Sequence, residues 1–225
     1  MLLAGAASLI GMFVQTRLRN KFRKYSQIPI STHMTGQEVA EAMLRFYNVQ
    51  GVDITQGQGT LTDHYNPATK VVSLSPDIYA GRSIMAAAVA AHECGHAIQH
   101  DTGYSMLQLR SGLVPLVNIA APLQQYLFMG ALFVAGGGFG QTILLLAIVA
   151  FGVTALFALV TLPVEFDASR RALVWLKETK TVRGAEYEGA KDALWWAAMT
   201  YVAAALSALV GLIYLVLRYM GASDD

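Results

Sequence analysis

Charged residues are scarce in this sequence. Asp, Glu, Lys and Arg make up 14% of the 225 residues, while 55% are hydrophobic and the mean hydropathy is +0.44. Soluble domains carry about 25% charged residues, so the deficit argues against a freely soluble protein. The net charge of +1 argues against a strongly basic nucleic-acid binder, and we expect no nucleic-acid partner. Cysteine is nearly absent too: the single Cys94 excludes an internal disulfide framework and fits a reducing compartment.

The uncharged residues form long continuous runs. Residues 111–164 form 54 consecutive positions without Asp, Glu, Lys, Arg or His. A spanning helix needs about 20 apolar residues, so this run predicts two spans joined by a glycine-rich turn at 136–140. Residues 193–217 and 1–16 predict two further spans. A signal peptide is the alternative for residues 1–16, but the basic residues follow this run instead of preceding it.

Lysine and arginine flank these spans unequally. Five basic residues directly follow the first span and six lie between the third and fourth, whereas the glycine-rich turn has none. The positive-inside rule places both basic segments in the cytoplasm, and four spans then put both termini outside. The predicted organisation is a span at 1–16, a cytoplasmic domain at 17–110, a hairpin at 111–164 with spans at about 112–135 and 141–163, a cytoplasmic helix at 165–192, a span at 193–217 and a tail at 218–225.

The polar segment 17–110 carries local signals of a small mixed domain. Thr35 followed by Glu38 is a capping box, which marks a helix start. Short runs rich in β-branched and aromatic residues, bounded by turn residues, indicate strands. In chain order we predict a helix from Thr35 to about Val49, strands at 52–55, 60–65 and 71–74, and a helix that begins at Pro76 or Ser83 and runs to about Gln99.

That last helix ends in an HExxH motif, His92 to His96. Residues at i and i+4 share a helix face, so both imidazoles can bind one metal ion. Glu93 lies one position on, where it can act as general base on a water molecule that zinc activates. An exposed or hydrogen-bonded polar patch at a helix end is the alternative. We favour the metal site, because burying His, Glu and His in the packed half of a helix without a partner costs several kcal/mol. Cys94 faces away from the metal, so we expect it to be a small residue of the core.

A catalytic zinc site needs a third protein ligand. Glu165 is the best candidate, because it is the first charged residue after the long apolar run and emerges on the same membrane face as the histidines. His100, four residues after His96, is the alternative third ligand. We expect it to support the site or to lie at the surface, and not to bind the metal.

Four segments together resemble the YugP-like bacterial membrane zinc metallopeptidases. In chain order they are LTDHYNP, LSP, HECGHAIQH and LPVEFDASRRA, and the resemblance spans about 59–171. The resemblance implies a neutral zinc peptidase of the gluzincin type. It implies that His92, His96 and Glu165 bind Zn²⁺ and that Glu93 is the catalytic base.

The sequence is also similar, more distantly, to the HtpX-like membrane peptidases. In those proteins an Asp follows the ligating Glu by four positions, whereas here the position is Ser169. Asp167 or Arg170 is then a candidate for supporting the ligands. The expected fold is a mainly α membrane protein with about four transmembrane helices and a small α+β zincin-like cytoplasmic domain that carries HExxH.

The segment around residues 59–65 is a second candidate for chemistry. A strand edge beside a metal-binding helix can bind a substrate backbone by strand addition. We hypothesise that His64 or Tyr65 donates to the oxyanion of the reacting carbonyl. A hairpin held by an Asx turn is the equally weighted alternative for this segment.

These observations predict a membrane-anchored zinc endopeptidase that hydrolyses peptide bonds with metal-activated water. Its partners would be the lipid bilayer and polypeptide substrates, membrane proteins among them, with the site on the cytoplasmic face of a bacterial plasma membrane. A site-2-type intramembrane protease is disfavoured, because only eight apolar residues separate His92 from Ser83 and Arg82 precedes them. A metal-stabilised scaffold without activity is disfavoured, because a structural zinc site has no use for Glu93.

Overall fold

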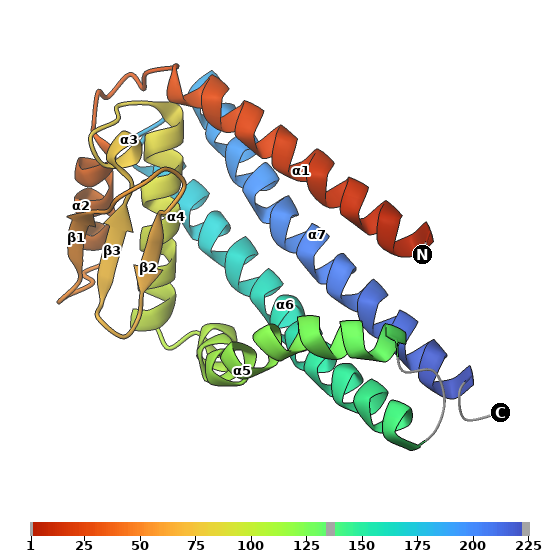
Figure 1. The fold of residues 1–225 in the computed structure, drawn as a ribbon. Coiled ribbons are helices and arrows are strands. Elements are labelled where there is room, and N and C mark those ends of the chain that lie inside the picture. The colour runs from red at the N-terminus through yellow and green to blue at the C-terminus, as the bar shows by residue number, and fades with distance from the viewer. Residues whose placement is uncertain (1, 134–137, 222–225) are drawn as a thin grey trace. The chain divides into compact units, whose positions relative to one another are not determined.

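The computed structural model describes residues 2–133 and 138–221 (Figure 1). The chain is mainly helical and has one small sheet. Its elements in chain order are α1 (Leu2–Ser26), α2 (Gly36–Phe46), β1 (Asp53–Gln56), β2 (His64–Asn66), β3 (Val71–Leu74), α3 (Pro76–Tyr79), α4 (Ile84–Asp101), α5 (Ser105–Phe133), α6 (Gly138–Glu178) and α7 (Ala185–Gly221).

Two helices among the described residues are long and apolar enough to cross a membrane. They are 140–178 and 185–221, which correspond to α6 and α7. α5 is largely uncharged, but it carries Pro115 and Pro122 inside the helix, and each proline removes a backbone hydrogen bond. Figure 1 shows that α5 bends along its length.

Two units divide the chain. The first comprises residues 1–13, 109–162 and 200–225. Its small buried cluster contains Leu144 and Ala147 from α6 and Leu215 from α7. Many large apolar side chains on these helices are exposed, among them Leu145, Leu146, Val149, Leu156, Ile213 and Leu217. An apolar exterior over a thin core is the surface expected of helices that face lipid.

The second unit comprises residues 14–108 and 163–199. Its three-stranded sheet has the order β1-β3-β2, with β1 parallel and β2 antiparallel to β3. Ile54 and Tyr65 both pair with Val72. β2 is thus an edge strand, and it lies beside α4 (Figure 1).

α4 forms the centre of the buried core in this second unit. Ser83 caps its start by accepting a hydrogen bond from the amide of Ala86, which satisfies one of the free N–H groups of the first turn. Small residues follow and are almost all buried, so neighbouring helices pack close to the α4 backbone. Cys94 is buried in this core, as its place on the helix predicted.

The first helix of this unit is tied to the last. Lys21 and Tyr25 near the end of α1 both bind the Asp192 carboxylate on α7, at 2.6 and 2.7 Å. The basic segment that follows the first predicted span is therefore joined to the polar start of the last one.

Several boundaries differ from those predicted. α1 continues to Ser26 instead of ending at residue 16, because its basic residues are good helix formers. β2 begins at His64 instead of residue 60, after Gly59 and Leu61 with positive φ. α6 begins at Gly138, so residues 138–140 are helical, while the rest of the predicted turn, 136–137, lies outside the described residues.

The region predicted as one cytoplasmic helix at 165–192 is built differently. It contains the end of α6, a turn, and the start of α7. Lys180 and Gly184 have positive φ in this turn, a conformation that ends a helix.

Candidate metal centre

Three candidate metal ligands come together in the second unit. His92 and His96 lie on α4 and Glu165 on α6, and one ligand atom from each residue lies within 4.8 Å of the others. The Nε2 atoms of His92 and His96 are 3.3 and 3.6 Å from Oε2 of Glu165. His96 and Glu165 are buried, and His92 is partly exposed.

A glycine allows α6 to approach α4 at this point. A Cβ atom added to Gly95 would lie 2.6 Å from the carbonyl oxygen of Ala168, a distance that real Cβ atoms do not reach. Gly95 is one residue from His96, and Ala168 is three from Glu165. The close helix contact therefore brings the carboxylate to the two imidazoles.

The other ring nitrogen of each histidine is also engaged. Nδ1 of His92 lies 3.1 Å from Ser169 Oγ, and Nδ1 of His96 lies 3.0 Å from Gln99 Oε1. Both Nε2 atoms therefore face the Glu165 carboxylate. Two ring nitrogens and a carboxylate oxygen that converge in this way form a site suited to a positively charged ion. Two imidazoles and a carboxylate suit zinc, so the residues present fit a zinc ion.

Glu93 is buried beside this group. Burial raises the pKa of Glu93 to about 7, the nearby Glu165 and Asp63 carboxylates add to the rise, and the His92 imidazole opposes it. A carboxylate with a pKa near neutrality can both take and return a proton, as a general base must.

His64 and Tyr65 occupy the edge strand β2. Tyr65 is half-buried, and its hydroxyl lies 2.8 Å from Nδ1 of His100. His64 is exposed, and its Nδ1 lies 2.8 Å from the carbonyl oxygen of Thr62. His100 thus contacts the edge strand and lies outside the group of three ligand candidates.

An Asx turn follows this strand. The Asn66 side chain accepts a hydrogen bond from the amide of Ala68 at 2.9 Å. Before the strand, the Asp63 carboxylate accepts hydrogen bonds from the amide and hydroxyl of Ser75, at 2.7 and 3.0 Å. The segment is therefore held at both ends by side-chain to backbone hydrogen bonds.

The predicted supporting residues, Asp167 and Arg170, are connected to the imidazole of His96 through the Gln99 side chain. Asp167 Oδ2 accepts hydrogen bonds from Gln99 Nε2 at 2.9 Å and from Arg171 Nε at 2.6 Å. Arg170 pairs with the other oxygen of Asp167, and its own side chain is largely exposed. Neither predicted residue has a described hydrogen bond to an imidazole.

The residues that contact the imidazoles were missed by the sequence reasoning. Ser169 contacts His92, and Gln99 contacts His96. Helical spacing offered a signal, since Gln99 is three residues after His96 and Ser169 four after Glu165. Polar residues at such positions on two buried helices are candidates for orienting the ligands.

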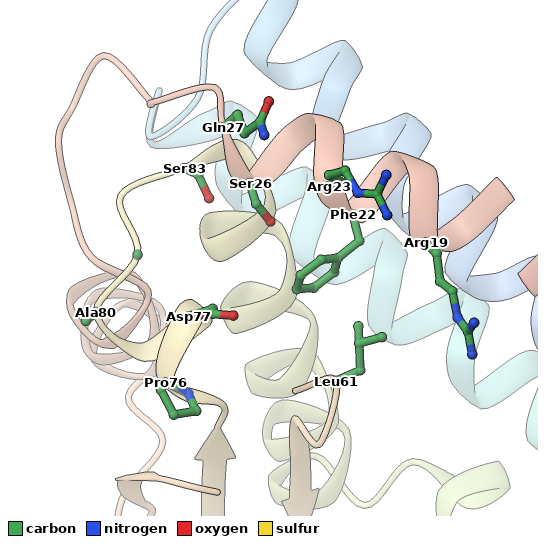
Figure 2. Close-up of a pocket in the computed structure, with 11 residues that line it drawn as sticks. Arg19, Phe22, Arg23, Ser26, Gln27, Leu61, Pro76, Asp77, Ala80 and Ser83 are labelled. Carbon is green, nitrogen blue, oxygen red and sulfur yellow. The ribbon is translucent and has the colours of Figure 1, made fainter. Parts of the chain in front are cut away.

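A cavity of about 700 Å³ lies elsewhere in the second unit. Figure 2 shows Arg19, Phe22 and Arg23 of α1 along it, with Pro76 and Asp77 of α3 among the other lining residues. None of the three ligand candidates lines it. The metal centre and this cavity are therefore built from different residues.

Comparisons with known proteins agree with the geometry. The chain is 38% identical over 220 residues to "Putative membrane protease YugP" of Bacillus subtilis (strain 168), and the match covers 98% of this chain and 96% of that protein. No solved structure matches the chain significantly. Residues 1–220 match the family described as "Putative neutral zinc metallopeptidase". The chain therefore belongs to this zinc metallopeptidase family.

Proposed function

We propose that this protein is a membrane-anchored zinc endopeptidase. One observation carries the proposal: His92, His96 and Glu165 converge within 4.8 Å, and Glu93 lies buried beside them. His92, His96 and Glu165 would hold the zinc ion, which leaves one coordination position for water or substrate. When bound, zinc acts as a Lewis acid and makes a nucleophile from water at neutral pH.

Glu93 would move the protons of the reaction. As a carboxylate it takes a proton from the attacking water, and as a carboxylic acid it returns that proton to the leaving amine. Its raised pKa supports both roles, because neither protonation state is far from neutral pH.

The proposed membrane placement has four spans. α6 and α7, the two described helices that are long and apolar enough to cross a membrane, would supply two of them, and α1 and α5 would supply the others. The basic segments 17–24 and 170–191 would lie in the cytoplasm by the positive-inside rule. The metal centre would then face the cytoplasm at the surface of a bacterial plasma membrane.

The proposed substrates are polypeptides, with membrane proteins or their juxtamembrane segments among them. The edge strand β2 would pair with the substrate backbone, and His64 or Tyr65 would donate to the oxyanion. The exposure of His64 favours it over Tyr65, whose hydroxyl contacts His100.

Two alternatives fit the geometry less well. A site-2-type intramembrane protease needs HExxH inside a span, whereas α4 packs in a core with α2 and the sheet. A scaffold without activity would leave unexplained a buried carboxylate whose pKa is raised.

Metal removal tests the proposal. We expect the purified protein to hold about one zinc ion per chain, to lose peptide cleavage when zinc is chelated, and to recover it when zinc is returned. Cleavage that persists in protein proved free of metal would contradict it.

A further inference from the structure

We propose that Gln99 is a positioning residue that fixes the tautomer of His96, so that Nε2 of His96 is the nitrogen left bare for the metal. This inference rests on the proposed zinc site, but the tautomer itself is a property of the metal-free protein. Gln99 is three residues after His96 on α4, and its side chain is fully buried.

The Gln99 amide makes three hydrogen bonds. Its Nε2 donates to the Val164 carbonyl at 2.8 Å and to Asp167 Oδ2 at 2.9 Å. Its Oε1 lies 3.0 Å from Nδ1 of His96. An amide nitrogen has two hydrogens, so both are used on α6.

The chemistry of the two α6 partners determines which way the amide points. The Val164 carbonyl has no hydrogen to give, and Asp167 is flanked by Arg170 and Arg171, which makes its carboxylate an acceptor. If the amide were rotated by 180°, Oε1 would face two oxygens and Nε2 would face the ring. Three buried oxygens would then lie together without a proton between them, which costs several kcal/mol.

The orientation of the amide determines the proton on His96. Because Oε1 can only accept, Nδ1 of His96 must carry a hydrogen and donate it. In the neutral ring Nε2 is then the bare nitrogen, and it is the atom that faces Glu165. The histidine is thus prepared for the metal before the metal binds.

The partner of His92 imposes no such choice. The Ser169 hydroxyl lies 3.1 Å from Nδ1 of His92 and can either donate or accept, because it rotates. Of the two histidines, only His96 has a partner whose donor and acceptor ends are determined by other groups.

The same amide joins the two halves of the site. Its α6 partners, Val164 and Asp167, lie one residue before and two residues after Glu165. Gln99 therefore links the helix that carries His96 to the turn of α6 that carries Glu165. Its loss is expected to disturb both the ring and its distance from the carboxylate.

Nitrogen-15 NMR of the histidine side chains in metal-free protein tests the tautomer. At a pH where His96 is neutral, we expect its Nδ1 to be the protonated nitrogen and Nε2 the bare one. This measurement uses the unaltered chain, so it does not depend on a variant that folds. A wild-type His96 with bare Nδ1 would overturn the proposal.

Two variants test the role of Gln99 itself. In Gln99→Leu we expect a mixed tautomer at His96 and a zinc affinity 10- to 100-fold lower. Ser169→Ala is the matched control for the spectrum: it should change the His92 signals and leave the His96 pattern intact. If Gln99→Leu keeps the wild-type His96 pattern or full zinc affinity, the positioning role is wrong. The NMR result stands whether or not the protein cleaves peptides, so it is distinguishable from failure of the proposed function.

Discussion

Gly95 on α4 lies directly against the backbone of Ala168 on α6, with no room for a methyl group between them. Gly95 lies between His92 and His96 on α4, and Ala168 lies three residues after Glu165 on α6, so this contact determines how near Glu165 comes to the two imidazoles. A position that carries no functional group thus controls the geometry of three that do.

Replacement of Gly95 by alanine is expected to separate the two helices at the site. An added Cβ would lie 2.6 Å from the Ala168 carbonyl oxygen, and overpacking of this kind costs about 1–3 kcal/mol of unfolding free energy. Zinc affinity should fall as well. Thermal unfolding and zinc titration of Gly95→Ala measure both effects.

Gly112→Ala is the matched control, because no atom lies within 4 Å of the Cβ that it would add to α5. It should leave stability unchanged or raise it by about 0.5–1 kcal/mol. Equal behaviour of the two alanine variants would show that the α4–α6 contact does not limit the site.

Glu165→Ala is expected to release zinc. The two histidines would remain, but a catalytic zinc site is built on three protein ligands. Metal analysis after dialysis against a weak chelator should show less than half an equivalent of zinc, against about one for the wild type. Glu188→Ala, which removes an exposed carboxylate from α7, should keep its zinc. Full affinity in Glu165→Ala would assign the third ligand elsewhere.

Glu93→Gln is expected to stabilise the metal-free protein at neutral pH. The folded chain holds the pKa of Glu93 at about 7, above the ordinary 4.5, because the carboxyl is buried. A raised carboxyl pKa means that the folded state binds the proton more tightly, so wild-type stability falls as pH rises from 4.5 to 7. The Glu93→Gln variant has an uncharged amide at this position, so its stability does not fall in this way.

The difference between Glu93→Gln and wild type should therefore be small near pH 4.5 and grow to as much as about 3 kcal/mol at pH 7 and above. Thermal unfolding in chelator across this pH range measures it. A difference that does not change with pH would show that burial of this carboxylate carries no cost.

Membrane orientation is open to a labelling test. In a Cys94→Ala background, a cysteine at Gln50 in the predicted cytoplasmic domain should resist an impermeant maleimide in intact cells and react after lysis. A cysteine at Gly221, at the end of α7, should react in intact cells. The reverse pattern would place the metal centre on the outer face.

Local features of the fold were predictable because they depend on residues near each other in sequence. The capping box is present as predicted, with Thr35 bound to the Glu38 amide and Glu38 to the Thr35 amide. The strand at 71–74 matches β3, and the HExxH spacing puts both imidazoles on one face of α4. Each of these follows from helix or strand geometry alone.

Features that depend on contact between distant segments were not predictable in the same way. The sequence does not reveal that Gly95 meets Ala168, or that Gln99 reaches Val164 and Asp167 across α6. Both depend on how α4 and α6 pack. A helix was predicted to begin at residue 165, but its continuity with the preceding span was not, because the change from apolar to charged residues alters the surroundings of a helix without ending it.

Polypeptide cleavage by Glu93→Gln, measured together with the zinc content of the variant, shows whether Glu93 is the general base of a zinc peptidase. We predict that the variant keeps about one zinc ion per chain and loses cleavage by at least 100-fold, because the general base contributes about 10²–10⁴ in rate. A zinc-loaded variant that cleaves at the wild-type rate would contradict the account.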